Sequence, residues 1–159
     1  MSEVLTRQQK VCAVGQRGFA AIGLDRCKDT ANLGGVLRAA QCYGAASVVV
    51  SGGRLGKYAT DTMKAYKHIP CMDVEDVMAC IPFGAVPVVV ELCDRAKSLF
   101  TFQHPESAFY IFGPEDGSVR KEIIDRAPLV VQIPTRLCMN LAATVNVVLY
   151  DRLMKRATA

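Results

Sequence analysis

The chain has 159 residues, 51% of them hydrophobic, and carries a formal net charge of +4. This length and apolar content suit one domain with a substantial core, spanning residues 1–159. Because no apolar run could span a bilayer and the first residues lack the profile of a signal peptide, we expect a cytoplasmic protein without a membrane partner.

Five short apolar runs, rich in β-branched residues, predict strands that are covered on both faces. In chain order they are residues 20–24, 47–50, 86–90, 109–112 and 129–133. Apolar residues at helical spacing predict helices between these runs, around residues 33–40, 74–78 and 123–124, and a last helix over 140–156. The alternation indicates an α/β fold with a mainly parallel sheet and helices on both faces.

Ligands of open parallel sheets bind beyond the carboxyl ends of the strands, so the segments that follow the strands are the candidate site. These segments are residues 25–34, 51–54, 91–95, 113–117 and 134–140. Segments 51–54 and 113–117 each carry two glycines, which either let a ligand approach the backbone or serve as ordinary turn residues.

Several familiar site patterns are absent from the sequence. There is no phosphate loop, no G-x-G-x-x-G, no H-E-x-x-H and no G-x-S-x-G. The two histidines, His68 and His104, have no evident triad or metal partner and are predicted to be surface or loop residues. The seven cysteines include no C-x-x-C pair, so we expect reduced thiols, most of them packed as small hydrophobes, and no metal site.

Three blocks place polar residues at predicted strand ends or helix starts. Asn32 and Arg38 lie six residues apart on the first helix; a helix cap also explains Asn32, and a salt-bridged structural residue is the favoured interpretation of Arg38 taken alone. Glu115 follows a strand in a Gly-Pro-Glu turn, which is either a wall of the ligand crevice or a simple tight turn. Asn140 opens the last helix and is also explained as a cap.

Taken together, the blocks resemble the three signature motifs of the SpoU/TrmH family in the SPOUT superfamily. The matching patterns are an N-x-G-x-x-x-R helix, an F-G-x-E-x-x-G turn and an I-P…C-x-N-L helix start. The resemblance covers residues 24–155, although Gly117 falls one residue early and Cys138 replaces the usual serine. It implies an RNA 2′-O-ribose methyltransferase that uses S-adenosylmethionine and acts as a homodimer on tRNA or rRNA.

The resemblance also implies a deep trefoil knot over residues 110–150, which is an exception to the rule that chains do not thread loops. The knot would hold the cofactor mainly through backbone groups. By motif match, the cofactor-binding residues are Glu91, Leu92, Ile111, Gly113, Gln132, Ile133, Cys138, Met139 and Leu141. The short chain looks like the stand-alone catalytic domains of the family, without an amino-terminal RNA-binding extension.

Catalytic roles carry over to four residues. Arg38 would clamp an RNA phosphate and polarise the 2′-hydroxyl, since an arginine stays protonated and makes a poor base. Asn32 would orient Arg38, Glu115 would pair with Arg38, and Asn140 would fix the knot loop and the cofactor. The thiol of Cys138 is a weaker hydrogen-bond donor than a serine hydroxyl, which weakens an expected phosphate contact.

RNA contacts are predicted in the amino-terminal part of the chain, where residues 1–70 hold ten Lys or Arg against four Asp or Glu. A solvated basic face would explain this imbalance equally well. The candidates for RNA contact near the first two strand ends are Arg26, Lys28, Arg54 and Lys57.

Two other functions fit the sequence less well: a family member that binds RNA or cofactor without turnover, and an unrelated flavodoxin-like flavin carrier.

Overall fold

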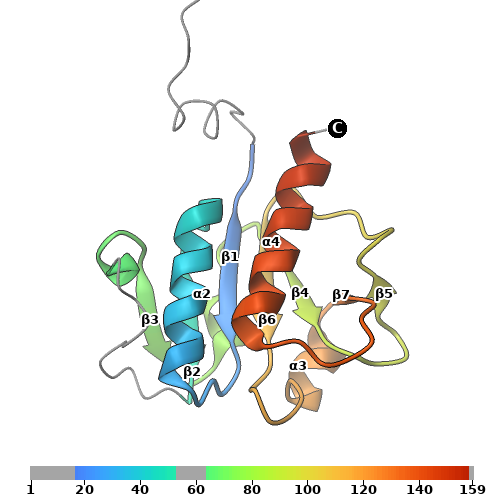
Figure 1. Cartoon of the computed structure of the whole chain (residues 1–159), viewed down its shortest axis with the longest axis horizontal. Coiled ribbons are helices and arrows are strands. Elements are labelled where there is room, and N and C mark those ends of the chain that lie inside the picture. The colour runs from blue at the N-terminus through green and yellow to red at the C-terminus, as the bar shows by residue number, and fades with distance from the viewer. Residues whose placement is uncertain (1–16, 53–63, 158–159) are drawn as a thin grey trace, which may run out of the picture.

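The computed structural model describes residues 17–52 and 64–157. Within them, seven strands form one sheet in the order β3-β2-β1-β6-β4-β7-β5, and all neighbouring strands run parallel (Figure 1). The strands are β1 (Ala20–Leu24), β2 (Val48–Ser51), β3 (Cys71–Val74), β4 (Val86–Val90), β5 (Lys97–Ser98), β6 (Ala108–Phe112) and β7 (Leu129–Gln132). The predicted parallel sheet is therefore confirmed.

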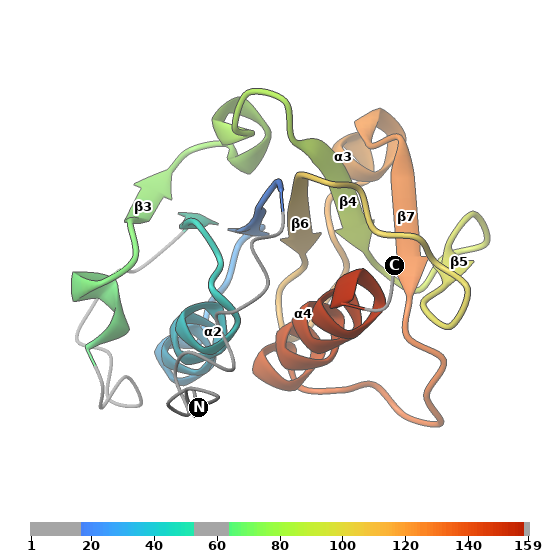
Figure 2. The ribbon, with the colours of Figure 1, turned by 90° about the horizontal axis from the view of Figure 1, so that it is seen from above.

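Helices cover both faces of this sheet, as predicted. Helices α2 (Thr30–Tyr43) and α4 (Leu141–Ala157) pack side by side on one face (Figures 1 and 2). Helix α3 (Lys121–Arg126) and the 3₁₀ helix η2 (Val77–Cys80) cover the other face, and a second 3₁₀ helix, η1 (Ala65–Lys67), lies near α2. Each face thus encloses its own hydrophobic core.

The secondary-structure prediction was wrong in one stretch and incomplete in two. Residues 74–78 are not an α-helix: β3 ends at Val74, and the 3₁₀ helix η2 begins after Asp76, whose carboxylate accepts from the Met78 amide. Strands β3 and β5 were not predicted because they are short, half-exposed edge strands without an apolar run.

The start of α2 shows which residue serves as the cap of this helix. Asp29, and not Asn32, caps this helix, since its carboxylate accepts from the Ala31 amide at 2.8 Å. The cap interpretation of Asn32 is therefore wrong. Further along α2, a Cβ added at Gly35 would lie 2.7 Å from the Cβ of Ala142, so this glycine permits the close packing of α2 against α4.

A buried network of hydrogen bonds holds α4 against the amino-terminal edge of the sheet, where the strands begin. The guanidinium of Arg152 donates to the carbonyls of Phe19, Pro105 and Glu106 and to the Tyr110 hydroxyl. His104, predicted to be a surface or loop residue, has a side chain that is 1% exposed. Its ring lies 2.6 Å from the Tyr110 hydroxyl and 2.8 Å from Asp151.

The tautomer of His104 follows from these partners. A carboxylate only accepts hydrogen bonds, so Nε2 carries the proton toward Asp151, and Nδ1 accepts from the Tyr110 hydroxyl. Burial lowers the pKa of His104 more than the nearby Asp151 raises it. The histidine that the sequence left without a partner is thus part of a buried Tyr-His-Asp arrangement.

The remaining sequence predictions concern His68, the cysteines, membrane-spanning helices and the knot. His68 is exposed, as expected. The six described cysteines are all free; Cys27 is buried and three others are partly buried, whereas Cys42 and Cys138 are exposed. No helix in residues 17–52 or 64–157 is long and apolar enough to cross a membrane. The trefoil knot stays a prediction.

Candidate active site

A pocket of about 420 Å³ opens where the sequence predicted the site, at the carboxyl ends of β4, β6 and β7 and the start of α4. Parallel strands all point toward this edge, so the loops that follow them converge there. Its walls are formed by Val90, Glu91, Leu92, Phe112, Gly113, Pro114, Glu115, Gly117, Gln132, Ile133, Thr135, Cys138, Met139, Asn140, Leu141 and Thr144.

The predicted cofactor residues lie at this pocket with one exception. Ile111 does not line it, because successive residues of a strand face opposite sides of the sheet. Ile111 is fully buried in the core beneath α3, and its neighbour Phe112 lines the pocket. Since the resemblance assigns the cofactor contacts mainly to backbone groups, the role of Ile111 stays a prediction.

Six wall residues were not among the predicted site residues: Val90, Phe112, Pro114, Gly117, Thr135 and Thr144, although Pro114, Gly117 and Thr135 lie in the segments expected to form the site. Thr144 was within reach of sequence reasoning, since it lies four residues after Asn140 and thus on the same face of the last helix. Its hydroxyl donates to the Asn140 carbonyl at 2.9 Å. No comparable periodicity marks the loop residues.

Hydrogen bonds join the three motif segments at the edge of the pocket. The side-chain amide of Asn140 donates to the Asn32 side-chain oxygen at 2.6 Å, and the Asn32 amide donates to Glu115 at 3.0 Å. Asn140 also caps α4, because its side-chain oxygen accepts from the Ala142 amide at 2.9 Å. Asn140 is therefore both a cap and part of the site.

Glu115 is the acceptor on which this chain of hydrogen bonds ends. It also accepts from the Cys27 thiol and from the backbone amides of Lys28 and Asp29. Partial burial raises the pKa of Glu115, but the hydrogen bonds from its own backbone, Asn32, Lys28 and Cys27 together outweigh it, so the net pKa is lowered. Glu115 is a carboxylate at neutral pH. Burial, followed by the nearby Glu115 charge, raises the pKa of Cys27 to about 12, so this thiol stays protonated and can donate.

The expected pairing of Glu115 with Arg38 is not formed in this chain. Arg38 is exposed on α2 and makes no hydrogen bond or ion pair with any residue in the described ranges. It does not line the pocket, and no described contact joins it to Asn32. Within the described residues no side chain pairs with Arg38, so the interpretation as a salt-bridged structural residue finds no support there.

The predicted RNA-contacting residues are in two situations. Arg26 donates to the Ser118 carbonyl and lies 3.5 Å from Asp25, while Lys28 forms an ion pair with Asp116 at 2.9 Å. The hydrogen bonds from Lys28 lower the pKa of Asp116. Both basic side chains are thus engaged within the chain. Arg54 and Lys57 lie outside the described residues.

The described residues offer no cluster of His, Cys, Asp and Glu that could hold a metal ion. The site consists instead of a pocket lined by both apolar and polar groups, which suits an organic ligand.

Comparisons with known proteins agree with this geometry. The profile of the SpoU rRNA Methylase family matches residues 20–150. No curated protein sequence matches the chain. Among solved structures, the SpoU methyltransferase AviRb from Streptomyces viridochromogenes, in complex with the cofactor AdoMet, is similar at 19% identity and a TM-score of 0.78, covering 91% of this chain and 60% of AviRb.

Two further structures are similar. One is the AdoMet-bound rRNA methyltransferase from Sinorhizobium meliloti, with 23% identity, a TM-score of 0.75 and coverage of 88% of this chain and 57% of that chain. The other concerns the 2-OH methylation of C/U34 on tRNA, with 20% identity, a TM-score of 0.72 and coverage of 87% and 96%. At these identities the likeness shows the fold alone. The chain spans less than two thirds of the length of AviRb and of the Sinorhizobium enzyme.

Proposed function

Because the chain belongs to the SpoU rRNA Methylase family, we propose that it transfers a methyl group from S-adenosylmethionine to a ribose 2′-hydroxyl of tRNA or rRNA. The observation that carries this proposal is the meeting of three motif segments at one pocket, joined by the hydrogen bonds from Asn140 through Asn32 to Glu115. An RNA-modifying enzyme with free thiols would work in the cytoplasm.

The pocket fits the proposed methyl donor in size and in lining. Its volume of about 420 Å³ falls within the range of ~300–1,000 Å³ that is usual for small-molecule sites. Leu92, Met139 and Leu141 offer apolar surface, while Glu91 and Gln132 offer polar groups. S-adenosylmethionine would supply a methyl group bound to a sulfonium. On transfer to the 2′-oxygen the carbon–sulfur bond would break to leave a neutral thioether, the hydroxyl proton would pass to water, and no metal is needed.

The work of the protein is then to align a feeble nucleophile. Arg38 remains protonated, so it serves as a clamp for an RNA phosphate and as a donor that polarises the 2′-hydroxyl. The absence of an internal partner for Arg38 in the described residues supports this role, since its charge is not already neutralised. In-line positioning supplies a further part of the acceleration.

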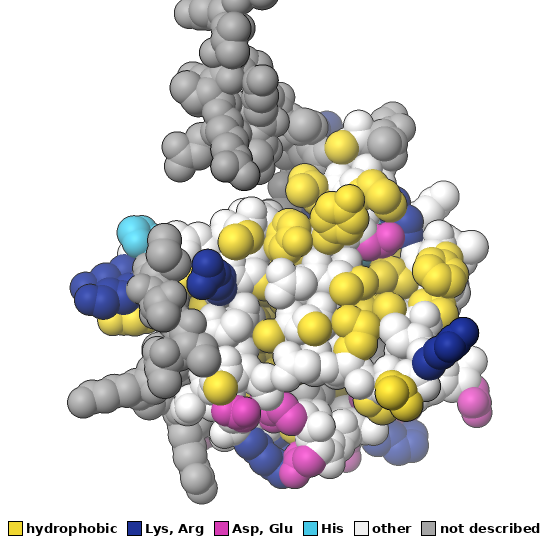
Figure 3. All heavy atoms as spheres, viewed as in Figure 1, with side chains coloured by type: hydrophobic (Ala, Val, Ile, Leu, Met, Phe, Trp, Pro, Cys, Tyr) yellow, Lys and Arg dark blue, Asp and Glu magenta, His cyan; other side chains and the backbone are white. Residues whose placement is uncertain are grey.

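A second copy of the chain completes the site in this proposal. Helix α4 carries a stripe of exposed apolar side chains at helical spacing, Val147, Tyr150 and Met154, and Figure 3 shows hydrophobic side chains gathered over this helix. Such a stripe suits an interface between two copies. Arg38 lies on α2, the helix packed against α4, from which it could reach the pocket of the partner. Tyr150→Glu should therefore yield monomers that do not transfer methyl groups, as read by sedimentation and by methylation of RNA.

One observation favours the weaker alternative of binding without turnover. The exposed side chain at residue 138 is a thiol, which donates a weaker hydrogen bond to a phosphate than the serine hydroxyl expected there. Cofactor binding together with an absence of methyl transfer to any cellular RNA would support that alternative.

The direct test is calorimetric titration of S-adenosylhomocysteine into the purified protein. The matched control is Thr144→Trp, which fills the pocket from one turn inside α4. We expect saturable binding to the wild type and none to the control. A control placed at Gly113 would be unsuitable, because even a Cβ there would meet backbone at 2.7 Å and distort the loop. Absence of binding to the wild type would overturn the proposal.

A further inference from the structure

The segment Gly113–Arg120 forms one wall of the pocket. The far end of this segment, residues 118–120, folds back behind Gly113. A Cβ at Gly113 would lie 2.7 Å from the Val119 nitrogen and 3.1 Å from the Ser118 carbonyl carbon. The two stretches of backbone therefore touch, which only glycine permits. Consequently, the positions of Ser118 and Val119 determine how far the Gly113 wall stands from a bound ligand.

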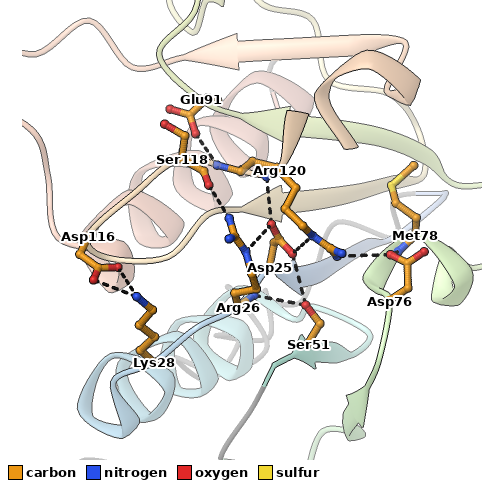
Figure 4. A network of polar contacts seen from close by, with 11 residues as sticks. Asp25, Arg26, Lys28, Ser51, Asp76, Met78, Glu91, Asp116, Ser118 and Arg120 are labelled. Atoms are coloured by element: carbon orange, nitrogen blue, oxygen red, sulfur yellow. Dashed lines mark hydrogen bonds and ion pairs between the residues drawn. The ribbon is translucent and has the colours of Figure 1, made fainter. Parts of the chain in front are cut away.

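Charged side chains hold three consecutive residues at this far end (Figure 4). The Ser118 carbonyl accepts from the Arg26 guanidinium at 3.0 Å. The Val119 amide donates to Glu91 at 2.8 Å, and the Arg120 amide donates to Asp25 at 3.0 Å. All three charged residues follow strands β1 or β4, so the sheet itself serves as the frame for the loop.

Asp25 is the centre of this frame and is fully buried. Besides the Arg120 amide, it accepts from Arg120 Nε at 2.8 Å and from the Ser51 hydroxyl at 3.3 Å. Removing an ion pair from water is costly, and replacing the whole pair by well-packed hydrophobic residues is often neutral or even stabilising. Stability alone therefore does not explain why a charge lies here.

The backbone of Arg26, the residue after Asp25, is also in an energetically unfavourable conformation. Arg26 has a φ of +58°, in the left-handed region that residues other than glycine seldom adopt. Strained backbone of this kind persists where the surrounding structure requires it, and it is concentrated near functional sites. Here the strained residue is the one that holds the Ser118 carbonyl.

Arg120 extends the frame to a further element. Its terminal NH2 is buried without a hydrogen bond in the described structure and lies 3.5 Å from Asp76, the residue that caps η2. Asp25 and Arg120 thus join the ends of β1 and β2, the start of η2 and the loop behind Gly113. Neither residue lines the pocket, so any influence on a ligand must pass through that loop.

We propose that Asp25 and Arg120 are a pair of positioning residues that fix the Gly113 wall and thereby set the affinity for the methyl donor. This inference rests on the proposed function. The pair acts on cofactor affinity and much less on turnover, because Glu115 is held separately by residues 27–32. Arg120→Lys should retain part of the effect, since the charge remains while the fork of hydrogen bonds is lost.

The experiment compares Arg120→Met with a matched variant, Arg95→Met. Both arginines hold α3: Arg120 precedes its first turn, whereas Arg95 donates to the carbonyls of Ile124 and Ala127 at its end and does not touch the loop. A role confined to stability would show in both variants. Asp25→Asn is the third variant. If Asp25→Asn does not fold, the test rests on the two Arg120 substitutions.

Calorimetry and steady-state kinetics give the first readout. Arg120→Met is expected to raise the Kd of S-adenosylhomocysteine and the KM of S-adenosylmethionine about tenfold, with kcat within about threefold. Arg120→Lys should raise both constants about threefold. Arg95→Met should lower Tm and leave both constants within about twofold. Unchanged affinity in Arg120→Met, or equal weakening in Arg95→Met, overturns the inference.

Hydrogen exchange gives a readout that needs no ligand and separates this inference from the proposed function. Amides of residues 113–120 should exchange at least about tenfold faster in Arg120→Met and at the wild-type rate in Arg95→Met. Unaltered exchange in Arg120→Met contradicts the positioning role. A wild type that does not bind S-adenosylhomocysteine, but whose loop loosens in this variant, would overturn the proposed function and the role in cofactor affinity while confirming that the pair holds the loop.

Discussion

The two edges of the sheet carry polar networks of opposite design. At the amino-terminal edge, the cation Arg152 binds carbonyls of the segments that enter β1 and β6. At the carboxyl-terminal edge, the carboxylates of Asp25, Glu91 and Glu115 bind backbone amides of the segments that leave the strands.

The difference between the edges lies in what the networks enclose. The bonds of Arg152, His104 and Asp151 all end on the chain itself, so that network serves to pin α4. The carboxyl-terminal network instead surrounds a pocket, and Glu91, Glu115 and Asn140 stand in its wall. From this comparison we expect stability to depend mainly on one edge and ligand binding on the other.

The largest effect is expected from Arg38, which belongs to neither network. Arg38→Ala should lower kcat about 10²–10³-fold, or about 3–4 kcal/mol, because a group directed at the reacting oxygen is lost. The melting temperature and the affinity for S-adenosylhomocysteine should stay at their wild-type values, since Arg38 has no hydrogen bond or ion pair within the described residues to lose. Single-turnover methylation of RNA measures the effect, and Arg38→Lys, with its charge retained, is the control. Activity near that of the wild type would remove Arg38 from the mechanism.

The residues of this site were predictable to different degrees. Apolar runs predict the alternation of strands and helices, and thus a pocket at the carboxyl ends of the strands. Motif spacing predicts the site residues Asn32, Glu115 and Asn140. The partners of Glu115 did not follow, because they depend on how two loops 83 residues or more apart in sequence fold against each other.

The amino-terminal network was missed for a similar reason. His104 lies in a polar segment, and nothing in its neighbours in sequence indicates that Asp151, 47 residues later, meets its ring. Edge strands β3 and β5 carry too few buried residues to produce a periodic pattern. Local patterns thus predict elements that bury a face, whereas pairing between distant polar groups needs the fold.

The second largest effect tests the amino-terminal edge. Arg152→Met should lower the free energy of unfolding by roughly 3 kcal/mol, because three carbonyls and the Tyr110 hydroxyl lose a buried donor. Urea denaturation measures the loss, and calorimetry should find the Kd of S-adenosylhomocysteine within about twofold of wild type. A large drop in affinity would show that the two edges are coupled and break the comparison.

Asn32→Leu probes the carboxyl-terminal edge with a side chain of similar size. The hydrogen bonds to Glu115 and from Asn140 are lost, so we expect about 1–2 kcal/mol lower stability. Because Asn140 stands in the pocket wall, the Kd of S-adenosylhomocysteine should also rise about tenfold. Asn32→Asp retains an acceptor for Asn140 and serves as the control. A variant that loses stability and keeps its affinity would assign Asn32 to the structure alone.

The smallest effect is a pH dependence of the amino-terminal edge. The pKa of His104 is lowered below its ordinary value of 6.5, so the unfolded chain binds the proton more readily than the folded one. The stability from this group is present above pH 6.5 and is lost as the pH falls through the lowered pKa. The Tm of the wild type should therefore decline between pH 7.5 and 5.5 more steeply than that of His104→Gln. Parallel declines would place the acid sensitivity elsewhere.

The function itself is tested most directly by the chemical position of the transferred methyl group. RNA lacking its natural modifications would be incubated with the protein and deuterated S-adenosylmethionine, digested to nucleosides and separated by mass. We predict the label on the ribose of one nucleoside, as a 2′-O-methyl group, and its loss in Arg38→Ala. A label on a base, or no label at all from a protein that binds S-adenosylhomocysteine, would contradict the proposed reaction.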